Sequence, residues 1–127
     1  MTPTIIVDAN VFLRYLLNDI KTQVLTAEKL FNKAKRKEVR LVVPQVVIFE
    51  IVFALNKYYN LEKDELIEKM DTVLSTSFLE IEERGLFVRS LELYQNKSIS
   101  FVDSFLLAKA ENEDAELFSF DKKLKRN

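Results

Sequence analysis

The segment TIIVDANVFLRYLL, residues 4–17, joins a short apolar run to a stretch with a helical pattern. Residues 4–7 are all β-branched, which is typical of a strand buried within a parallel sheet. Residues 10–17 then fit a helix. Asp8 therefore stands at the point where a buried strand ends and a helix begins.

The same alternation of strand and helix continues along the chain. Short apolar runs predict further strands at 40–43, 78–81 and 116–119, and helical periods predict helices at 22–37, 45–58, 63–75, 84–96 and 101–112. This pattern indicates an α/β fold with a mostly parallel sheet. With one Gly, two Pro and neither a linker nor a repeat, residues 1–127 are expected to form a single domain.

The composition restricts the chemistry that the chain can perform. With 48% hydrophobic and 31% charged residues, it is typical of a soluble globular protein. There is no Cys and no His, which excludes disulfides, thiolate metal sites, imidazole ligands and His general bases. Catalysis at neutral pH is therefore expected to depend on carboxylates. No apolar segment approaches the roughly 20 residues of a membrane span, so we expect a cytoplasmic protein.

The charge is nearly balanced, with 19 basic and 20 acidic residues and a net charge of -1. The molecule as a whole therefore has no general attraction to nucleic acid. Basic residues gather within 33–40 and 122–126. Each cluster forms either a solvated helix surface or a local contact to phosphate groups.

Two acidic residues in the first half of the chain are candidates for a site. Asp8 follows the first predicted strand, where it either joins a site or caps the next helix. Glu50 shares one helical stripe with the apolar residues Val46 and Phe53. A carboxylate on such a stripe needs a cation or hydrogen bonds. The alternative for Glu50 is a weak surface ion pair with Lys57.

Two more candidates lie in the second half. Asp103 is on the apolar side of a predicted helix, and Ser100, three residues earlier, makes a capping motif the alternative. Asp121 follows the last predicted strand and precedes a basic segment. It either belongs to a site or caps a terminal helix formed by that segment. Each signal is weak when taken alone.

Taken together, the four acids predict a metal site. The carboxyl ends of parallel strands meet at one edge of a sheet, and that edge is where open α/β sheets bind ligands. Four gathered carboxylates repel one another unless a divalent cation neutralises them. Oxygen-only ligands suit Mg²⁺ or Mn²⁺, and such sites hydrolyse phosphodiester bonds with activated water.

The motifs around these acids resemble those of PIN-domain nucleases, in particular the VapC-like toxin ribonucleases of VapBC toxin–antitoxin pairs. The matching stretches are IIVDANVFLRYLL, VVPQVVIFEIVFAL, SISFVDSFLLAKA and LFSFDKKLK, which together cover essentially the whole chain. The resemblance implies a three-layer α/β/α domain around a central, mostly parallel sheet of four to five strands. It also implies a homodimer that cleaves RNA as an endoribonuclease and binds an antitoxin protein.

The resemblance assigns roles to individual residues as well. It implies that Asp8, Glu50, Asp103 and Asp121 bind one or two Mg²⁺ or Mn²⁺ ions and carry the catalysis, and that the residues lining the site include Asn10 and Ser119. From their positions beside these residues, the basic side chains expected to contact RNA phosphates are Arg14, Lys122 and Lys123.

Other functions compete with this interpretation. A haloacid-dehalogenase-like phosphatase also has an Asp after an apolar strand, but it needs a second Asp two residues later, where this chain has Asn10. A housekeeping RNA-processing nuclease and a catalytically weak binding module of the same fold remain open alternatives. RNA cleavage by the purified protein distinguishes the nucleases from the binding module.

Overall fold

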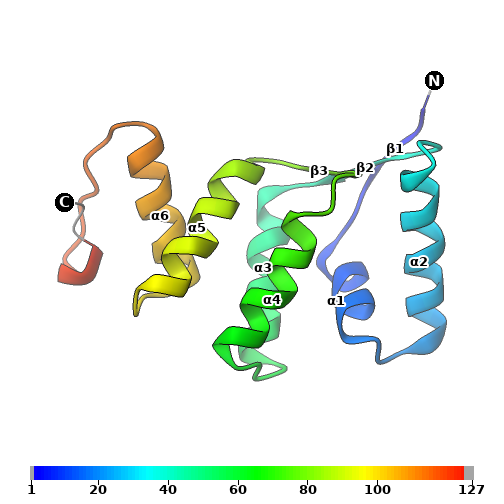
Figure 1. The fold of residues 1–127 in the computed structure, drawn as a ribbon, viewed down its shortest axis with the longest axis horizontal. Coiled ribbons are helices and arrows are strands. Elements are labelled where there is room, and N and C mark those ends of the chain that lie inside the picture. The colour runs from blue at the N-terminus through cyan, green and yellow to red at the C-terminus, as the bar shows by residue number, and fades with distance from the viewer. Residues whose placement is uncertain (1, 125–127) are drawn as a thin grey trace.

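A computed structural model of the protein describes residues 2–124, and its sheet consists of three parallel strands (Figure 1). These are β1 (Thr4–Ile6), β2 (Arg40–Val43) and β3 (Leu79–Ile81), in the order β1-β2-β3. Thr4 lies opposite Arg40, and Val43 lies opposite Ile81. The predicted α/β fold with a parallel sheet is confirmed.

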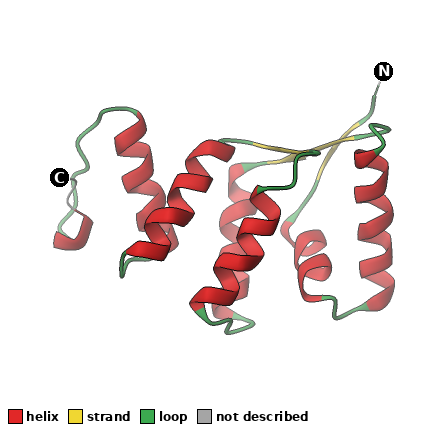
Figure 2. Cartoon of the chain, in the orientation of Figure 1, coloured by secondary structure: helices red, strands yellow, loops and turns green. Residues whose placement is uncertain are grey.

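The described residues also form six α-helices, of which α1 and α2 connect β1 to β2, α3 and α4 connect β2 to β3, and α5 and α6 follow β3. They are α1 (Ala9–Leu17), α2 (Lys21–Lys35), α3 (Gln45–Lys57), α4 (Lys63–Leu74), α5 (Arg84–Asn96) and α6 (Phe101–Asn112), followed by the short 3-10 helix η1 (Lys122–Leu124). Each of the six α-helices begins and ends within two residues of its predicted bounds. Figure 2 shows the strands along one side of the molecule, with α1 and α2 at one end and α5 and α6 at the other. None of the helices within residues 2–124 is long and apolar enough to cross a membrane.

The strand predicted at 116–119 is wrong, and the described sheet has three strands instead of four to five. The segment does alternate as a strand does, because Leu117 and Ser119 are half-buried whereas Phe118 and Phe120 are exposed. It lies beyond α6, far from the sheet in Figure 1, so no strand is beside it to complete a ladder. An alternating pattern predicts a strand only where a partner is within reach.

The core is built around β2 and α3. Leu41 and Val43 from β2 and Ile51 from α3 are fully buried in one apolar cluster. Phe49, also on α3, contacts Phe87 on α5 with ring centroids 5.3 Å apart in an edge-on geometry. It makes similar contacts with Phe101 and Phe105 of α6. These aromatic contacts attach α5 and α6 to the rest of the molecule.

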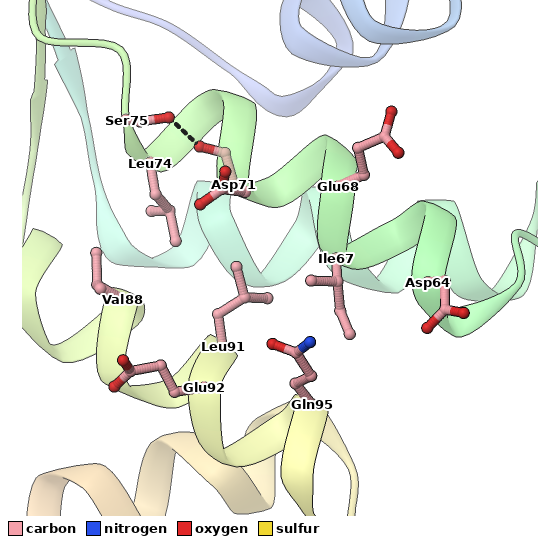
Figure 3. Close-up of a pocket in the computed structure, with 10 residues that line it drawn as sticks. All are labelled: Asp64, Ile67, Glu68, Asp71, Leu74, Ser75, Val88, Leu91, Glu92 and Gln95. Atoms are coloured by element: carbon pink, nitrogen blue, oxygen red, sulfur yellow. Dashed lines mark hydrogen bonds between the residues drawn. The ribbon is translucent and has the colours of Figure 1, made fainter.

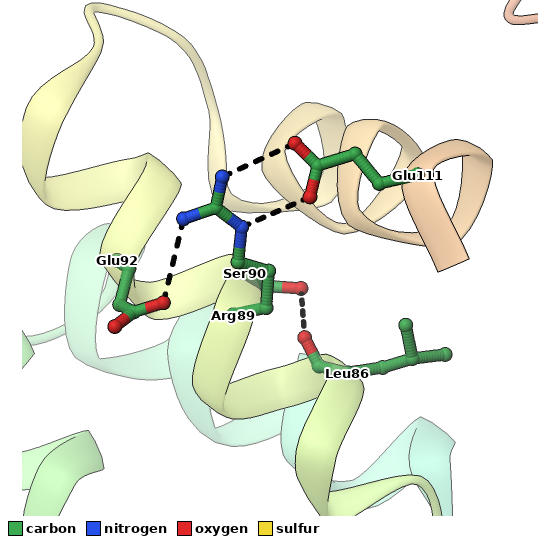
Figure 4. A network of polar contacts seen from close by, with 5 residues as sticks. All are labelled: Leu86, Arg89, Ser90, Glu92 and Glu111. Carbon is green, nitrogen blue, oxygen red and sulfur yellow. Dashed lines mark hydrogen bonds and ion pairs between the residues drawn. The ribbon is translucent and has the colours of Figure 1, made fainter. Parts of the chain in front are cut away.

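Helices α5 and α6 are joined to each other by an ion pair and by a second apolar cluster, which contains Leu86, Leu93, Leu107, Ala108 and Leu124. The guanidinium of Arg89 donates two hydrogen bonds to Glu111 on α6, at 2.9 and 3.1 Å, and one to Glu92, at 3.4 Å (Figure 4). The bond to Glu111 raises the pKa of Arg89 above its ordinary value. The buried hydroxyl of Ser90 donates to the carbonyl oxygen of Leu86 at 2.7 Å. The two helices therefore form one unit, called here the α5–α6 hairpin.

Phe87 is the best single test of how this hairpin is attached, because its side chain is fully buried against Phe49, Phe101 and Phe105. Phe87→Ala should lower the free energy of unfolding by about 3–5 kcal/mol, as large core truncations do. Urea denaturation measures it. The control is Leu25→Ala on the exposed surface of α2, expected to change stability by no more than about 0.5 kcal/mol. Equal effects of the two substitutions would contradict the packing described here.

Candidate active site

Asp8 lies just beyond the end of β1. The strand pairing extends one residue past β1, because the backbone N–H of Val7 donates to the carbonyl oxygen of Val42 at 3.1 Å. Asp8 then caps α1: its Oδ1 accepts hydrogen bonds from the backbone N–H groups of Asn10, at 3.0 Å, and Val11, at 3.4 Å. Both bonds use the same oxygen, which leaves Oδ2 for a ligand. Capping and a site role are therefore compatible for this residue.

Glu50 lies in the second turn of α3, which begins directly after Pro44. Its side chain is exposed, and so are those of Val46 and Phe53 on the same stripe. The stripe therefore faces outward and is not buried in the core. Within residues 2–124 no ion pair joins Glu50 to Lys57, so the salt-bridge alternative is not realised.

The structure brings Asp8, Asn10 and Glu50 together as lining residues of one pocket of about 470 Å³. The pocket opens at the carboxyl end of the sheet because β1 leads directly into Asp8 and β2 leads through Pro44 into α3. Two carboxylates and a side-chain amide provide hard oxygen ligands, which suit Mg²⁺ or Mn²⁺.

The other two predicted acids do not line this pocket. Asp103 is half-buried in the first turn of α6, where its backbone N–H donates to Ser100 Oγ at 3.1 Å. Asp121 is exposed, and its Oδ1 accepts from the backbone N–H of Lys123 at 2.9 Å. Ser119 Oγ in turn accepts from the N–H of Asp121 at 3.0 Å. Both acids are therefore found in local helix caps, which the sequence analysis gave as the alternative to a role in the site.

The predicted site residues are therefore divided between two places. Ser119, Lys122 and Lys123 stay beside Asp121 beyond α6, away from the pocket that contains Asp8. No group of three or more acidic residues within 2–124 could hold a metal ion. The four-acid metal site remains a prediction.

Arg14 lies close to the pocket but is held by protein partners. Its Nη2 donates to the hydroxyl of Tyr59, and its Nε lies 3.4 Å from Asp19 Oδ1, an ion pair without a hydrogen bond. Only 14% of its side chain is exposed. Its expected contact to an RNA phosphate stays a prediction.

Sequence reasoning missed the aromatic side chains that line the same pocket. Tyr58 and Tyr59 follow the end of α3, and Tyr58 is 72% exposed. Phe53 packs edge-on against Tyr58 with ring centroids 5.7 Å apart. The sequence does indicate these aromatic residues, because two adjacent Tyr follow Glu50 by about two helical turns, at positions that the apolar core does not require.

A larger cavity, of about 810 Å³, lies between α4 and α5 (Figure 3). Its floor is apolar, with Ile67 and Leu91, and acidic residues of both helices stand at its rim. It lies beside Leu74 and Ser75, which precede β3, and so it is not at the carboxyl end of the sheet, where α/β proteins bind ligands. The pocket with Asp8 and Glu50 is the better candidate.

Comparison with known proteins shows the family of the chain. A family model described as PIN domain matches residues 5–127. The chain belongs to the PIN domain family. A VapC ribonuclease from Aquifex aeolicus (strain VF5) is 27% identical over 122 residues, covering 95% of this chain and 90% of that protein. The resemblance inferred from the motifs is confirmed.

The capping role of Asp8 can be tested separately from any catalytic role. Asn caps helices as well as Asp does, whereas Ala does not. Asp8→Asn should therefore leave the free energy of unfolding within about 0.5 kcal/mol of wild type, and Asp8→Ala should lower it by about 1 kcal/mol. Chemical denaturation without divalent cations measures both. Equal stabilities of the two variants would show that the cap does not stabilise α1.

Proposed function

We propose that this protein is a Mg²⁺- or Mn²⁺-dependent endoribonuclease that hydrolyses RNA phosphodiester bonds, and that it is the toxin of a type II toxin–antitoxin pair. The observation that carries the proposal is the pocket that Asp8, Asn10 and Glu50 line at the carboxyl end of a PIN-domain sheet. The similarity to a VapC ribonuclease supports RNA as the substrate and an antitoxin protein as a partner.

The residues of the pocket fit a divalent cation. Asp8 Oδ2 and the carboxylate of Glu50 would bind the ion, with the amide oxygen of Asn10 nearby, and the chain has no softer ligand to compete. A bound cation supplies an activated water and stabilises the charge on the leaving oxygen. Asp103 and Asp121 are proposed to complete the ligand set.

Other residues would hold the RNA. The exposed ring of Tyr58 beside the carboxylates offers a surface on which an unpaired base can stack. Because the net charge is -1, flanking phosphates need local cations. Lys122 and Lys123, directly after Asp121 and exposed, are the proposed phosphate contacts.

The first test is the loss of activity in Asp8→Asn, which removes a charge while keeping the volume and the helix cap. Cleavage of a mixed RNA pool with Mn²⁺ should fall to the rate measured with EDTA, because the ion loses a ligand. Asp71→Asn, the same change at the rim of the α4–α5 cavity, should cleave as wild type does. Full activity of Asp8→Asn would exclude Asp8 from the site. RNA binding without cleavage by the wild type would indicate the binding module instead.

The second test measures metal binding without activity. A cation that binds only the folded protein raises its stability by mass action, by about 2.7 kcal/mol at 100 times the dissociation constant. Mn²⁺ should therefore raise the unfolding temperature of the wild type and raise that of Glu50→Gln much less. Glu68→Gln, at the rim of the other cavity, should keep the full shift. An unchanged shift in Glu50→Gln would place the ion elsewhere.

A further inference from the structure

Arg14 is an unusual basic residue, because its side chain is largely buried at the end of α1. It lies in the last turn of this helix, and 14% of its side chain is exposed. Its Nη2 donates to the hydroxyl of Tyr59, and its buried Nε lies 3.4 Å from Asp19 Oδ1. A cation withdrawn from water needs such partners. Since Tyr59 follows α3 and Asp19 precedes α2, the guanidinium joins three segments of the chain.

One of these contacts joins the two helices that carry the acids of the pocket. Asp8 caps α1 at its first turn, and Glu50 lies on α3. Both helices begin at the carboxyl end of the sheet, so their other ends lie away from it. Arg14 is in the last turn of α1, and Tyr59 stands two positions after Lys57, the last residue of α3. Their hydrogen bond therefore ties the two helices at the ends that the sheet does not hold.

The backbone of the turn after α3 is bonded only to α3 itself. The N–H groups of Tyr58 and Tyr59 both donate to the carbonyl oxygen of Ala54, at 3.0 and 3.1 Å. The N–H of Leu61 also donates to a carbonyl oxygen of α3, at 3.0 Å. These bonds fix the turn relative to its own helix. The side-chain bond from Arg14 is the contact that fixes the same turn relative to α1.

This turn presents an exposed aromatic ring to the pocket. The ring is that of Tyr58, which packs edge-on against Phe53 and precedes Tyr59 in the chain. Both Tyr residues line the pocket together with the two carboxylates. A base can stack on such a ring only if the face of the ring is accessible and correctly placed. The placement of the turn therefore decides whether the ring can be used.

We propose that Arg14 is a positioning residue for RNA: by holding Tyr59 it fixes the turn, so that the ring of Tyr58 stands where an unpaired base stacks beside the carboxylates. Arg14 then acts on RNA through the two Tyr residues and does not bind a phosphate itself. The inference rests on the proposed function, which gives the ring of Tyr58 this use.

The first experiment measures RNA binding by fluorescence anisotropy of a labelled single-stranded RNA of mixed sequence, with Ca²⁺ in place of Mn²⁺ to suppress cleavage. Tyr58→Ala should weaken binding about 5- to 150-fold, as the loss of one stacked base does. Tyr59→Phe removes only the hydroxyl that Arg14 binds, and it should weaken binding about 2- to 10-fold, the effect of one hydrogen bond. Its control, Tyr15→Phe, should bind as the wild type does. Equal binding by Tyr59→Phe and the wild type would overturn the proposal.

A second comparison separates positioning from a direct phosphate contact. Arg14→Met keeps an unbranched side chain but loses the donors, and it should weaken binding as Tyr59→Phe does. In the Tyr58→Ala background it should cause no further loss, because the ring that it positions is absent. The slope of log affinity against log salt concentration should also stay as in the wild type. A loss that persists in Tyr58→Ala, with a slope smaller by about 0.7, would show a phosphate contact and overturn the proposal.

Kinetics distinguish positioning from a general effect on folding. With Mn²⁺, Tyr59→Phe should raise the KM for RNA and leave kcat close to that of the wild type, because the carboxylates are unchanged. A variant that merely folds less well loses active molecules, so its apparent kcat falls while its KM stays the same. A fall in kcat alone would therefore contradict a positioning role.

The position of the turn is also measured without RNA. In protein labelled with 3-fluorotyrosine, the ¹⁹F NMR signal of Tyr58 is assigned by its loss in Tyr58→Phe. This signal should shift and narrow in Arg14→Met, although the substitution is 44 positions away in the sequence. Arg36→Met, which breaks an exposed ion pair with Glu38, is the matched control and should leave it unchanged.

The NMR result separates the two proposals. An unchanged Tyr58 signal in Arg14→Met would show that Arg14 does not hold the turn, whatever the protein does to RNA. A wild type that neither binds nor cleaves RNA would contradict the proposed function, and the signal would still decide whether Arg14 positions the ring.

Discussion

The parallel pairing of β1 with β2 is the constraint on which the candidate site depends. It continues to the hydrogen bond between Val7 and Val42, so the chain leaves both strands at the same edge. Asp8 then begins α1, and Pro44 begins α3. Glu50, in the second turn of α3, lines the same pocket as Asp8 although 42 positions separate them in the sequence. A register shift of one residue would turn every side chain of β1 to the other face.

Most of the secondary structure was predictable because its signals are local. The β-branched run at 4–7, Pro44 and the capping residue Ser100 each specify where an element begins. The tight turns were harder to predict from the sequence. Lys37 and Glu83 adopt a left-handed backbone conformation, with φ of 65° and 57°, in a chain whose single Gly lies within a helix. No residue type at these positions announces such a turn.

The candidate site was predictable only in part, because helix capping and metal binding use the same side chain. The sequence presented these roles as alternatives for Asp8 and Asp121. In the structure the capping bonds of both residues are accepted by Oδ1 alone, which fixes the carboxylate and leaves the second oxygen for a ligand. A cap can therefore orient a metal ligand instead of competing with it. Which acids lie in one pocket depends on where the α5–α6 hairpin packs. That position is determined by contacts between residues far apart in the sequence, which local patterns do not predict.

The failed strand at 116–119 and the divided set of acids have a single physical cause. The hairpin packs on α3 through the contact of its Phe87 with Phe49, and it holds Asp103 and Asp121 on its own side of the molecule. Four carboxylates in one pocket would repel one another, and the placement of Asp103 and Asp121 on the hairpin keeps them apart from Asp8 and Glu50.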